Sequence, residues 1–386
     1  MNKINYLTSG ESHGKSLLGI IEGIPANLEI NAKDINYQLA RRQCGYGRGG
    51  RMKIENDNIE ILSGLRNGIT MGSPIGLKLD NLDWANWKDI MSVKKHSSKA
   101  KKITLPRPGH ADLAGIQKYG MDDIRNVIER SSARETAMRV AIGSVCRIML
   151  KEVGINIASR VTQIHDVIDD RTKVDYNSDL DKLNKKLDKS DLRCANNELE
   201  KVMKKRIDKA KNNGDTVGGC FEVFANGLPY GLGSYTQWDK KLQAQIAYSL
   251  MSINAFKGVE FGMGFNSANL FGSELMDEIK YHNNKYIRTQ NNMGGIEGGM
   301  SNAQPLVVKV IMKPLSTLTK PLMSVDIKTK EPKLAHKERT DTCAVPAASV
   351  IAESMLCIVI ADSLLYKFGG DSINQLKLHM EQSAKF

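Results

Sequence analysis

Two short segments that contain histidine hold the residue types best suited to proton transfer. Residues 10–14 read G-E-S-H-G, and residues 107–112 read R-P-G-H-A-D. Histidine donates and accepts protons near neutral pH, so His13 and His110 are candidate acid–base groups. A loop histidine is also commonly structural, and Asp112 can either orient His110 or accept a purely structural hydrogen bond. G-E-S-H-G is not a serine nucleophile elbow, because that motif needs a strand-to-helix turn.

A third segment combines arginine with glycine. Residues 45–50 read G-Y-G-R-G-G and match the dinucleotide fingerprint G-x-G-x-x-G. That fingerprint needs a strand before it and a helix after it, whereas a helix is expected before this segment and a strand after it. Two interpretations are left: a glycine turn that brings backbone close to a ligand beside Arg42, Arg48 and Arg51, or a tight structural turn with surface arginines.

A fourth segment, residues 130–135, reads R-S-S-A-R-E at the expected start of a long helix. Ser132 and Glu135 fit a capping box. The free N–H groups of a helix N-terminus favour anions, and Arg130 and Arg134 would add donors for phosphate or carboxylate. Capping and anion binding are compatible, so both interpretations are kept.

Three segments of the C-terminal half have similar character. Residues 294–302 read G-G-I-E-G-G-M-S-N, a glycine density that indicates close backbone approach to a flat or phosphorylated ligand. Residues 313–317 read K-P-L-S-T and offer a cation and two hydroxyls. Residues 339–343 read R-T-D-T-C before a long apolar helix. There Asp341 is either a favourable helix N-terminal charge or a catalytic acid or base.

The elements that must position these segments follow from caps and hydrophobic periodicity. Helices are predicted over 31–42, from 132 onward, and over 196–213, 238–253 and 345–368. Strands are predicted over 17–30 (strand, turn, strand), 52–62, 75–79, 218–225 and 306–312, and a basic loop over 92–105. With no regular β-α-β alternation, this mixture favours an α+β fold with antiparallel sheets over a doubly wound parallel sheet. No linker or repeat is evident, so we expect a single domain over 1–386.

Composition narrows the classes of function. The 386 residues are 41% hydrophobic and 25% charged, which is ordinary for a globular protein. Six cysteines without a CxxC pair argue against a disulfide framework or structural zinc, and we expect them to be small buried residues and no metal to be bound. The net charge of +12 admits nucleic acid, anionic lipid or small anions as partners. The lysine-rich runs 94–102 and 201–211 lack Phe, Trp and Tyr, which argues against nucleic-acid binding and favours solvated surface.

Location is inferred from two further features. No apolar signal-peptide region opens the sequence. The longest apolar stretch, 345–366, is interrupted by Glu353 and Asp362, which predicts a buried helix and not a membrane span. We therefore expect a cytoplasmic enzyme without a membrane partner.

Taken together, these segments resemble those of the chorismate synthase family, in order and along nearly the whole chain. The matching stretches are GESHG (10–14), RRQCGYGRGGRMKIE (41–55), RPGHADLAG (107–115), RSSARETAMRVA (130–141), MSINAFKGVE (251–260), GGIEGGMSN (294–302), KPLST (313–317) and ERTDTCAVPAA (338–348).

This resemblance implies a carbon–oxygen lyase that converts 5-enolpyruvylshikimate-3-phosphate to chorismate and phosphate. The reaction is a 1,4-anti elimination without net redox change that requires reduced FMN, and it is the last step of the shikimate pathway towards aromatic amino acids. The family fold is a β-α-β sandwich with a helical core between antiparallel sheets, assembled as a homotetramer. An arginine-dense pocket suits this substrate, which carries two carboxylates and a phosphate.

The resemblance also assigns catalytic roles. His13 and His110 match two histidines that donate protons to the leaving phosphate and the reduced flavin. Asp341, with Ser132, matches the group that deprotonates flavin N5, which then takes the substrate proton.

Binding roles are implied in the same way. The positions that match FMN contacts are Arg130, Ser131, Ser132, Asn254, Ala255, Gly298, Lys313, Pro314, Leu315, Ser316, Thr317 and Arg339. Arg42 and Arg48 match positions assigned to NADP or to substrate, and Arg107, Arg134 and Arg339 would grip the phosphate and carboxylates of the substrate.

One competing enzyme class uses the same loops. An NADPH-dependent flavin oxidoreductase would transfer hydride and consume NADPH in step with product, whereas the elimination consumes none once FMN is reduced. Whether this chain reduces its own FMN with NADPH is left open by the sequence.

Overall fold

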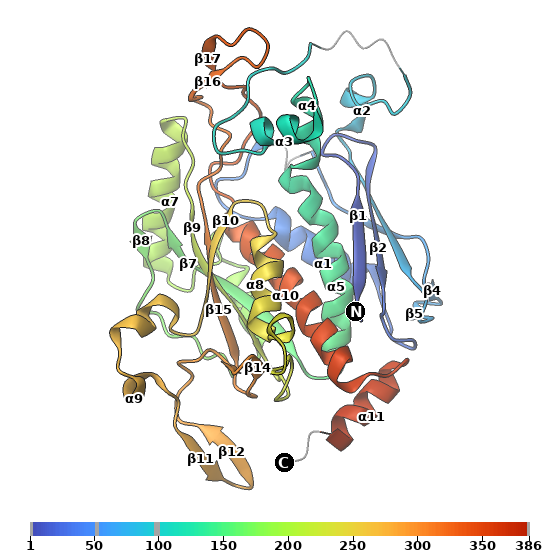
Figure 1. Ribbon diagram of the computed structural model, residues 1–386, viewed down its shortest axis with the longest axis vertical. Coiled ribbons are helices and arrows are strands. Elements are labelled where there is room, and N and C mark those ends of the chain that lie inside the picture. The colour runs from blue at the N-terminus through green and yellow to red at the C-terminus, as the bar shows by residue number, and fades with distance from the viewer. Residues whose placement is uncertain (1–2, 51–53, 96–100, 384–386) are drawn as a thin grey trace.

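The structure is a computed structural model that describes residues 3–50, 54–95 and 101–383. Two antiparallel sheets face each other across a layer of helices (Figure 1). The strands of the first sheet, in spatial order, are β1 (Asn5–Ser9), β2 (Ser16–Glu22), β6 (Ile75–Asp80) and β3 (Ile59–Ile61). Those of the second are β10 (Phe256–Phe261), β15 (Leu306–Met312), β9 (Gly219–Asn226), β7 (Asn156–Ile164) and β8 (Val167–Ile168).

Both sheets pair antiparallel at every neighbouring strand. The predicted α+β class, with a helical core between antiparallel sheets, is therefore confirmed, and a doubly wound parallel sheet is excluded.

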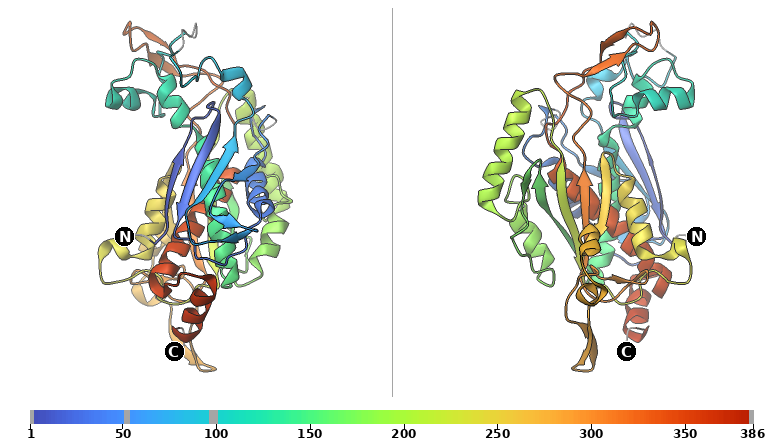
Figure 2. Two further views of the ribbon diagram at one scale, coloured as in Figure 1. Left: turned by 90° about the vertical axis from the view of Figure 1, so that its right-hand side faces the viewer. Right: turned by 60° about the vertical axis from the view of Figure 1, so that its left-hand side comes forward.

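Three helices form the central layer: α1 (Ala32–Gln43), α5 (Thr136–Glu152) and α10 (Val345–Phe368). By length and composition α10 could cross a membrane, but 89% of its most apolar window is buried inside the fold. Figure 2 shows α10 in red between the blue N-terminal sheet and the second sheet. Helix α5 crosses α10 at Gly143, where an added Cβ would lie 2.4 Å from the carbonyl oxygen of Ser354, so a glycine is needed for this close packing.

Alternation along β2 explains how the first sheet covers α5. Leu17 and Ile21 are buried while Ile20 is exposed, because successive side chains of a strand point to opposite faces. Gly19 faces inward, and a Cβ there would lie 2.6 Å from the sulfur of Met138 on α5. The sheet therefore rests directly on the helix layer.

Shorter elements surround this sandwich. On the second sheet and its edges lie α6 (Leu180–Leu187), α7 (Asn197–Asn212) and α8 (Leu242–Met251). At one end of the molecule lie α2 (Trp84–Trp87), α3 (Asp112–Tyr119), α4 (Arg125–Arg130) and the hairpin of β16 (Met323–Val325) and β17 (Pro332–Leu334). At the other end lie α9 (Gly272–Leu275), the hairpin of β11 (Ile279–His282) and β12 (Lys285–Arg288), and α11 (Ile373–Ser383) (Figure 1). Small antiparallel pairs are β4 (Leu65–Arg66) with β5 (Ile69–Thr70), and β13 (Ile296–Glu297) with β14 (Met300–Ser301).

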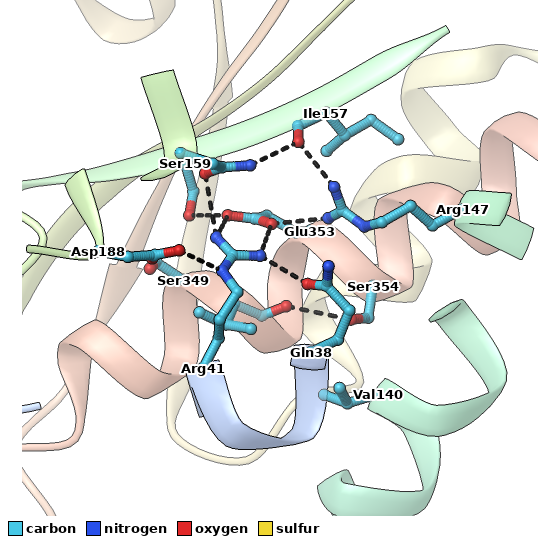
Figure 3. A network of polar contacts seen from close by, with 12 residues as sticks. Gln38, Arg41, Val140, Arg147, Ile157, Ser159, Asp188, Ser349, Glu353 and Ser354 are labelled. Carbon is cyan, nitrogen blue, oxygen red and sulfur yellow. Dashed lines mark hydrogen bonds and ion pairs between the residues drawn. The ribbon is translucent and has the colours of Figure 1, made fainter. Parts of the chain in front are cut away.

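A buried ion network ties the helix layer to β7. The carboxylate of Glu353 on α10 accepts hydrogen bonds from Arg41 at 2.8 and 3.0 Å, from Arg147 at 2.6 Å, from Arg193 at 3.0 Å and from the Ser159 hydroxyl at 2.6 Å. Figure 3 shows the side chains of Arg41, Arg147 and Ser159 converging on this carboxylate. Burial alone would raise the pKa of Glu353, but the three guanidinium groups lower it to about 2. A buried charge is tolerated only with such partners, so the network aligns α1, α5 and α10.

Most predicted elements are confirmed, and the differences have local causes. Helices α1, α7, α8 and α10 and strands β6, β9 and β15 lie where periodicity predicted them. The second strand of 17–30 is wrong: residues 23–30 make only isolated bridges, at Ala26 and Glu29. The strand predicted over 52–62 reduces to β3, and its residues 52 and 53 lie outside the described part of the chain. In the predicted basic loop, the described residues 92–95 and 101–105 are irregular, and residues 96–100 lie outside the description.

The cysteines differ partly from expectation. All six, each among the described residues, are free thiols. Four are buried as predicted, but Cys220 is half-buried and Cys44, directly after α1, is exposed.

Candidate active site

A cavity of about 350 Å³ lies where the end of α1 meets the segments that lead into α5 and α10. Its wall carries more positive than negative side chains among the described residues. Two carboxylates, Glu338 and Asp341, line it. Six cations line it: Arg42, Arg48, Arg107, Arg134, Lys313 and Arg339. Such a wall is suited to an anionic ligand that carries several charges.

His13 is held at this wall by Glu129. Its backbone N–H donates to Glu129 Oε2 at 2.8 Å, and its Nδ1 lies 3.0 Å from Oε1. Burial opposes ionisation of Glu129, but the hydrogen bond from His13 lowers the pKa of this carboxyl. An ionised acceptor keeps the proton on Nδ1, so Nε2 is the nitrogen left for proton exchange. The turn needs a glycine at Gly10, which has φ +103° and would place a Cβ 2.4 Å from the carbonyl oxygen of Ser16.

Asp112 performs both roles that the sequence left open. Its Oδ1 lies 2.6 Å from His110 Nδ1, which orients that ring. The same carboxylate also accepts bonds from the backbone N–H, Nε and Nη2 of Arg107 at 2.9 to 3.0 Å. Burial alone would raise the pKa of Asp112, yet these partners hold it well below its usual range. One buried carboxylate thus fixes a histidine and an arginine of the cavity.

The segment 313–317 is bound to the loop of His110. Ser316 Oγ donates to the carbonyl oxygen of Gly109 at 2.6 Å, and Arg107 Nη1 donates to Thr317 Oγ1 at 2.8 Å. Lys313 donates to Ser316 Oγ at 2.7 Å, and burial lowers the pKa of this lysine. These hydroxyls therefore shape the wall as well as facing the cavity.

The serines before α5 form another part of the wall. Ser132 caps the short 3₁₀ turn Ala133–Glu135 by accepting from the N–H of Arg134, and its hydroxyl accepts from Ser12 Oγ at 3.0 Å. The reciprocal half of the predicted capping box, in which the N–H of Ser132 would donate to the Glu135 carboxylate, is wrong, because that carboxylate accepts instead from Thr8 and Arg139. The chain enters the helix through a 3₁₀ turn, which changes the direction of the Glu135 side chain.

Two arginines of the wall are fixed from behind by Asp57. Arg134 Nη1 donates to Asp57 Oδ1 at 2.5 Å and its Nε donates to Asn81 at 2.8 Å. Arg42 donates to Thr136 Oγ1 and to the carbonyl oxygen of Ala133, while its Nη1 is buried without a hydrogen-bond partner, 3.7 Å from Asp57. Burial lowers the pKa of Arg42 to about 10. Asp57 Oδ2 is likewise buried without a hydrogen-bond partner, so this atom and Arg42 Nη1 stabilise each other as an ion pair behind the wall.

The glycine-rich segment 45–50 packs against protein as well as lining the cavity. A Cβ at Gly49 would lie 2.6 Å from the carbonyl oxygen of Thr340, so the turn permits two loops to touch. The N–H of Gly49 donates to Asp341 Oδ1 at 2.6 Å, and Arg48 Nε lies 3.0 Å from Asp341 Oδ2. Only 11% of the Arg48 side chain is exposed, which favours a turn that faces the cavity over a turn with surface arginines at this position. Arg51 lies outside the described residues.

The segment after α8 contains one residue with an unusual, left-handed backbone conformation. Ala255 has φ +68°, a left-handed conformation that costs about 1–2 kcal/mol outside glycine. Its carbonyl oxygen accepts from the N–H of Lys313 at 2.9 Å, and the neighbouring Asn254 donates to the carbonyl oxygen of Ser131 at 2.9 Å. These bonds hold the strained residue in the cavity wall.

Most site residues predicted from the sequence meet at this cavity. Those that line it are His13, Arg42, Arg48, Arg107, His110, Ser131, Ser132, Arg134, Asn254, Ala255, Lys313, Leu315, Ser316, Thr317, Arg339 and Asp341. Arg130, Pro314 and Gly298 do not. Arg130 donates to the carbonyl oxygens of Gly10 and Thr8 and lines a different cavity between β1 and α8, and Gly298 lies in the turn between β13 and β14.

Sequence reasoning missed carboxylates that lie in the wall or behind it. Glu129 immediately precedes the R-S-S-A-R-E segment, and Glu338 immediately precedes R-T-D-T-C, so adjacency to a motif was an available signal. Asp57 carries no such signal. Within the described residues no group of three or more His, Cys, Asp or Glu side chains gathers closely enough to hold a metal ion.

Known proteins resemble this chain over nearly its whole length. A family model described as chorismate synthase matches residues 4–365. Curated proteins named chorismate synthase from Alkaliphilus metalliredigens and Enterococcus faecalis are 52% identical over 372 residues and 50% identical over 378 residues. The first alignment covers 96% of this chain and 97% of the relative, and the second covers 97% of each. A solved crystal structure of a chorismate synthase, 41% identical, superposes with a TM-score of 0.80 and covers 99% of this chain and 97% of its own.

Proposed function

This chain belongs to the chorismate synthase family, and on that premise we infer that it converts 5-enolpyruvylshikimate-3-phosphate to chorismate and inorganic phosphate. It is a carbon–oxygen lyase of the shikimate pathway. In the 1,4-anti elimination a C–O bond to phosphate and a C–H bond break, a new C=C bond forms, and the proton and phosphate leave. The products have the same oxidation level as the substrate.

The observation that carries this proposal is the excess of cations around two oriented histidines. Six cationic side chains face two carboxylates in one cavity, which suits a substrate with a phosphate and two carboxylates. Arg107, Arg134 and Arg339 are proposed to grip these groups, and Arg42 and Arg48 to bind substrate or NADP. Each arginine is held by protein contacts, so little side-chain entropy is lost on binding.

The histidines are proposed as proton donors. Both rings have Nδ1 against a buried carboxylate, Glu129 for His13 and Asp112 for His110. This arrangement directs Nε2 of each ring to proton exchange with a bound anion or cofactor. Asp341, with Ser132, is proposed to accept a proton, since its carboxylate also lines the cavity.

Reduced FMN is proposed as the cofactor. When bound, it supplies electron density to the allylic system of the substrate and recovers it. The residues present fit a phosphorylated group, because the cations Arg42, Arg48 and Lys313 line the same wall as the hydroxyls of Ser131, Ser132, Ser316 and Thr317. With them, Asn254, Ala255, Lys313, Leu315 and Arg339 are proposed to hold FMN, with Pro314 shaping the loop. Arg130 and Gly298 lie outside the wall, so we propose no direct contact for them.

The domain organisation, assembly, location and reductant of this protein are also proposals. One core cluster contains residues of both sheets and of α1, α5 and α10, which supports a single domain over 1–386. Membership of the family is the only support for a homotetramer, a cytoplasmic location and NADPH as reductant.

The test is phosphate release from 5-enolpyruvylshikimate-3-phosphate under anaerobic conditions, with chemically reduced FMN and without NADPH. Phosphate release matched by chorismate formation is expected. A folded, FMN-binding protein that released no phosphate under these conditions would contradict the elimination and favour the NADPH-dependent oxidoreductase.

A further inference from the structure

Trp87, the last residue of α2, lies flat against the ring of His13. The two ring centroids are 3.8 Å apart and the planes differ by 17°. His13 is buried and Trp87 is half-buried, so the indole covers one face of the imidazole. Glu129 contacts the edge of the same ring at Nδ1. One face and one edge of His13 are therefore fixed by other side chains.

Trp87 is itself held in place from two sides of the cavity. The guanidinium carbon of Arg125 lies 5.0 Å from the indole centroid, and Arg125 is bonded to Glu129 at 3.3 Å and to Glu338 at 2.8 Å. At the start of α2, Asp83 accepts from Arg339 at 2.6 Å. Burial opposes ionisation of Asp83, but bonds from Asn86, Arg339 and Trp87 lower its pKa. Helix α2 is thus fastened to both the His13 side and the Arg339 side.

The stack restricts the orientation of the histidine ring. A flat neighbour at 3.8 Å prevents the imidazole from turning about its Cβ–Cγ bond, so Nε2 keeps one direction. Loss of alignment at a reacting group can cost about 10²-fold in rate.

We propose that Trp87 is a positioning residue that holds the His13 ring in the plane needed for proton donation. This rests on the proposed function, in which His13 donates a proton. Trp87 itself does not line the cavity, so it acts through the histidine.

Steady-state kinetics separate positioning from packing. Trp87→Leu is expected to lower kcat for phosphate release by about 10- to 100-fold, with KM within about three-fold of wild type. Trp87→Phe keeps an aromatic face and is expected to recover most of the activity, which also guards against misfolding of the leucine variant. Trp84→Leu, on the same turn of α2, is the matched control and is expected to stay near wild type.

A double-mutant cycle tests whether Trp87 acts through His13. In the His13→Ala background, Trp87→Leu is expected to cause no further loss of kcat. If the two losses multiply instead, Trp87 has a role that is independent of His13 and the proposal is overturned.

Tryptophan fluorescence detects the contact between Trp87 and His13 without any assay of activity. The chain has three tryptophans, so Trp84→Phe/Trp238→Phe leaves Trp87 as the single emitter. Because a stacked imidazole quenches indole emission, His13→Ala in this background is expected to raise it. Unchanged emission would show that the two rings are not stacked and would overturn the proposal. If His13→Ala raises the emission in this background but the wild-type protein releases no phosphate, the proposed function alone is contradicted, since the stack is then established independently.

Discussion

Arg41 and Arg42 are consecutive residues of α1, yet their guanidinium groups reach different parts of the molecule. Arg41 binds Glu353 in the buried ion network, at 2.8 and 3.0 Å. Arg42 binds Thr136 Oγ1 and lines the cavity. Consecutive side chains leave a helix about 100° apart, so one helix end can serve both sites. The last turn of α1 therefore couples the position of a cavity arginine to the ion network of the core.

Lysine substitutions at these two positions should give opposite results. Arg42→Lys removes a donor from the cavity and is expected to raise KM for substrate by about ten-fold or more, with a smaller fall in thermal midpoint than Arg41→Lys. Arg41→Lys breaks a bidentate bond to a buried carboxylate and is expected to lower the thermal midpoint by several degrees with a smaller change in KM. Kinetics and thermal unfolding of both variants check this. Equal effects from the two variants would contradict the separate roles.

Each cavity histidine should be needed for turnover but not for cofactor binding. His13→Ala and His110→Ala are each expected to lower kcat by about 10²-fold or more, because each removes a proton donor. FMN affinity, measured by flavin fluorescence, should stay near wild type. Near-wild-type turnover in either variant would remove that histidine from the mechanism.

Asp112 should matter far more than a surface carboxylate. Asp112→Asn weakens bonds to both His110 and Arg107 and is expected to lower kcat/KM by about ten-fold or more. Asp122→Asn is the control, because Asp122 is exposed and pairs only with Lys102 at the surface, where such pairs contribute about 0–1 kcal/mol. Phosphate release by the two variants gives the comparison. A D112N enzyme as active as D122N would show that Asp112 is not needed to orient the cavity.

Asp341 can be tested as a base separately from its structural bond. Asp341→Asn keeps an oxygen that accepts from the N–H of Gly49 but cannot take a proton in the same way. We expect kcat to fall by about 10²-fold with little change in thermal midpoint. Asp341→Ala should lose kcat and also destabilise the Gly49 loop. Full activity of the asparagine variant would leave Asp341 a structural residue only.

Glu353 should make stability depend on pH in the acid range. Its pKa is lowered to about 2 in the folded chain, against about 4.3 in the unfolded chain. The stabilisation is therefore present above about pH 4.3 and is lost as pH falls towards 2. Glu353→Gln is expected to lower the free energy of unfolding at pH 7 by about 3 kcal/mol or more, and to flatten the decline in stability between about pH 5 and 2.

Urea unfolding at pH 7 and at pH 3 measures this change. Glu198→Gln is the control, since Glu198 is an exposed residue of α7 that pairs with Lys201. Two variants with the same pH dependence of stability would contradict the role of the buried network.

Local signals were sufficient for much of the fold. Asn31 caps α1 and Asn196 caps α7 by accepting from nearby N–H groups, as their residue types predict. The apolar run of α10 predicted a buried helix because Glu353 interrupts it. The capping box predicted at Ser132 forms only in part. The Glu135 carboxylate accepts from Thr8, which is distant in the sequence, and not from the N–H of Ser132. The strand predicted within residues 23–30 does not form, because a strand needs a pairing partner and the local sequence does not specify one.

By itself the sequence determined the residue types of the site, the order of its segments, the caps and periods of its main helices and the resemblance to a known family. Only the tertiary structure decided which side chains meet: Glu129 with His13, Asp57 with Arg134, Trp87 over His13, and Gly298 away from the cavity. These pairs are far apart in the chain, so their contact depends on how sheets and helices pack. Caps and periodicity act over a few residues, and they carry no information about which distant surface each side chain will face.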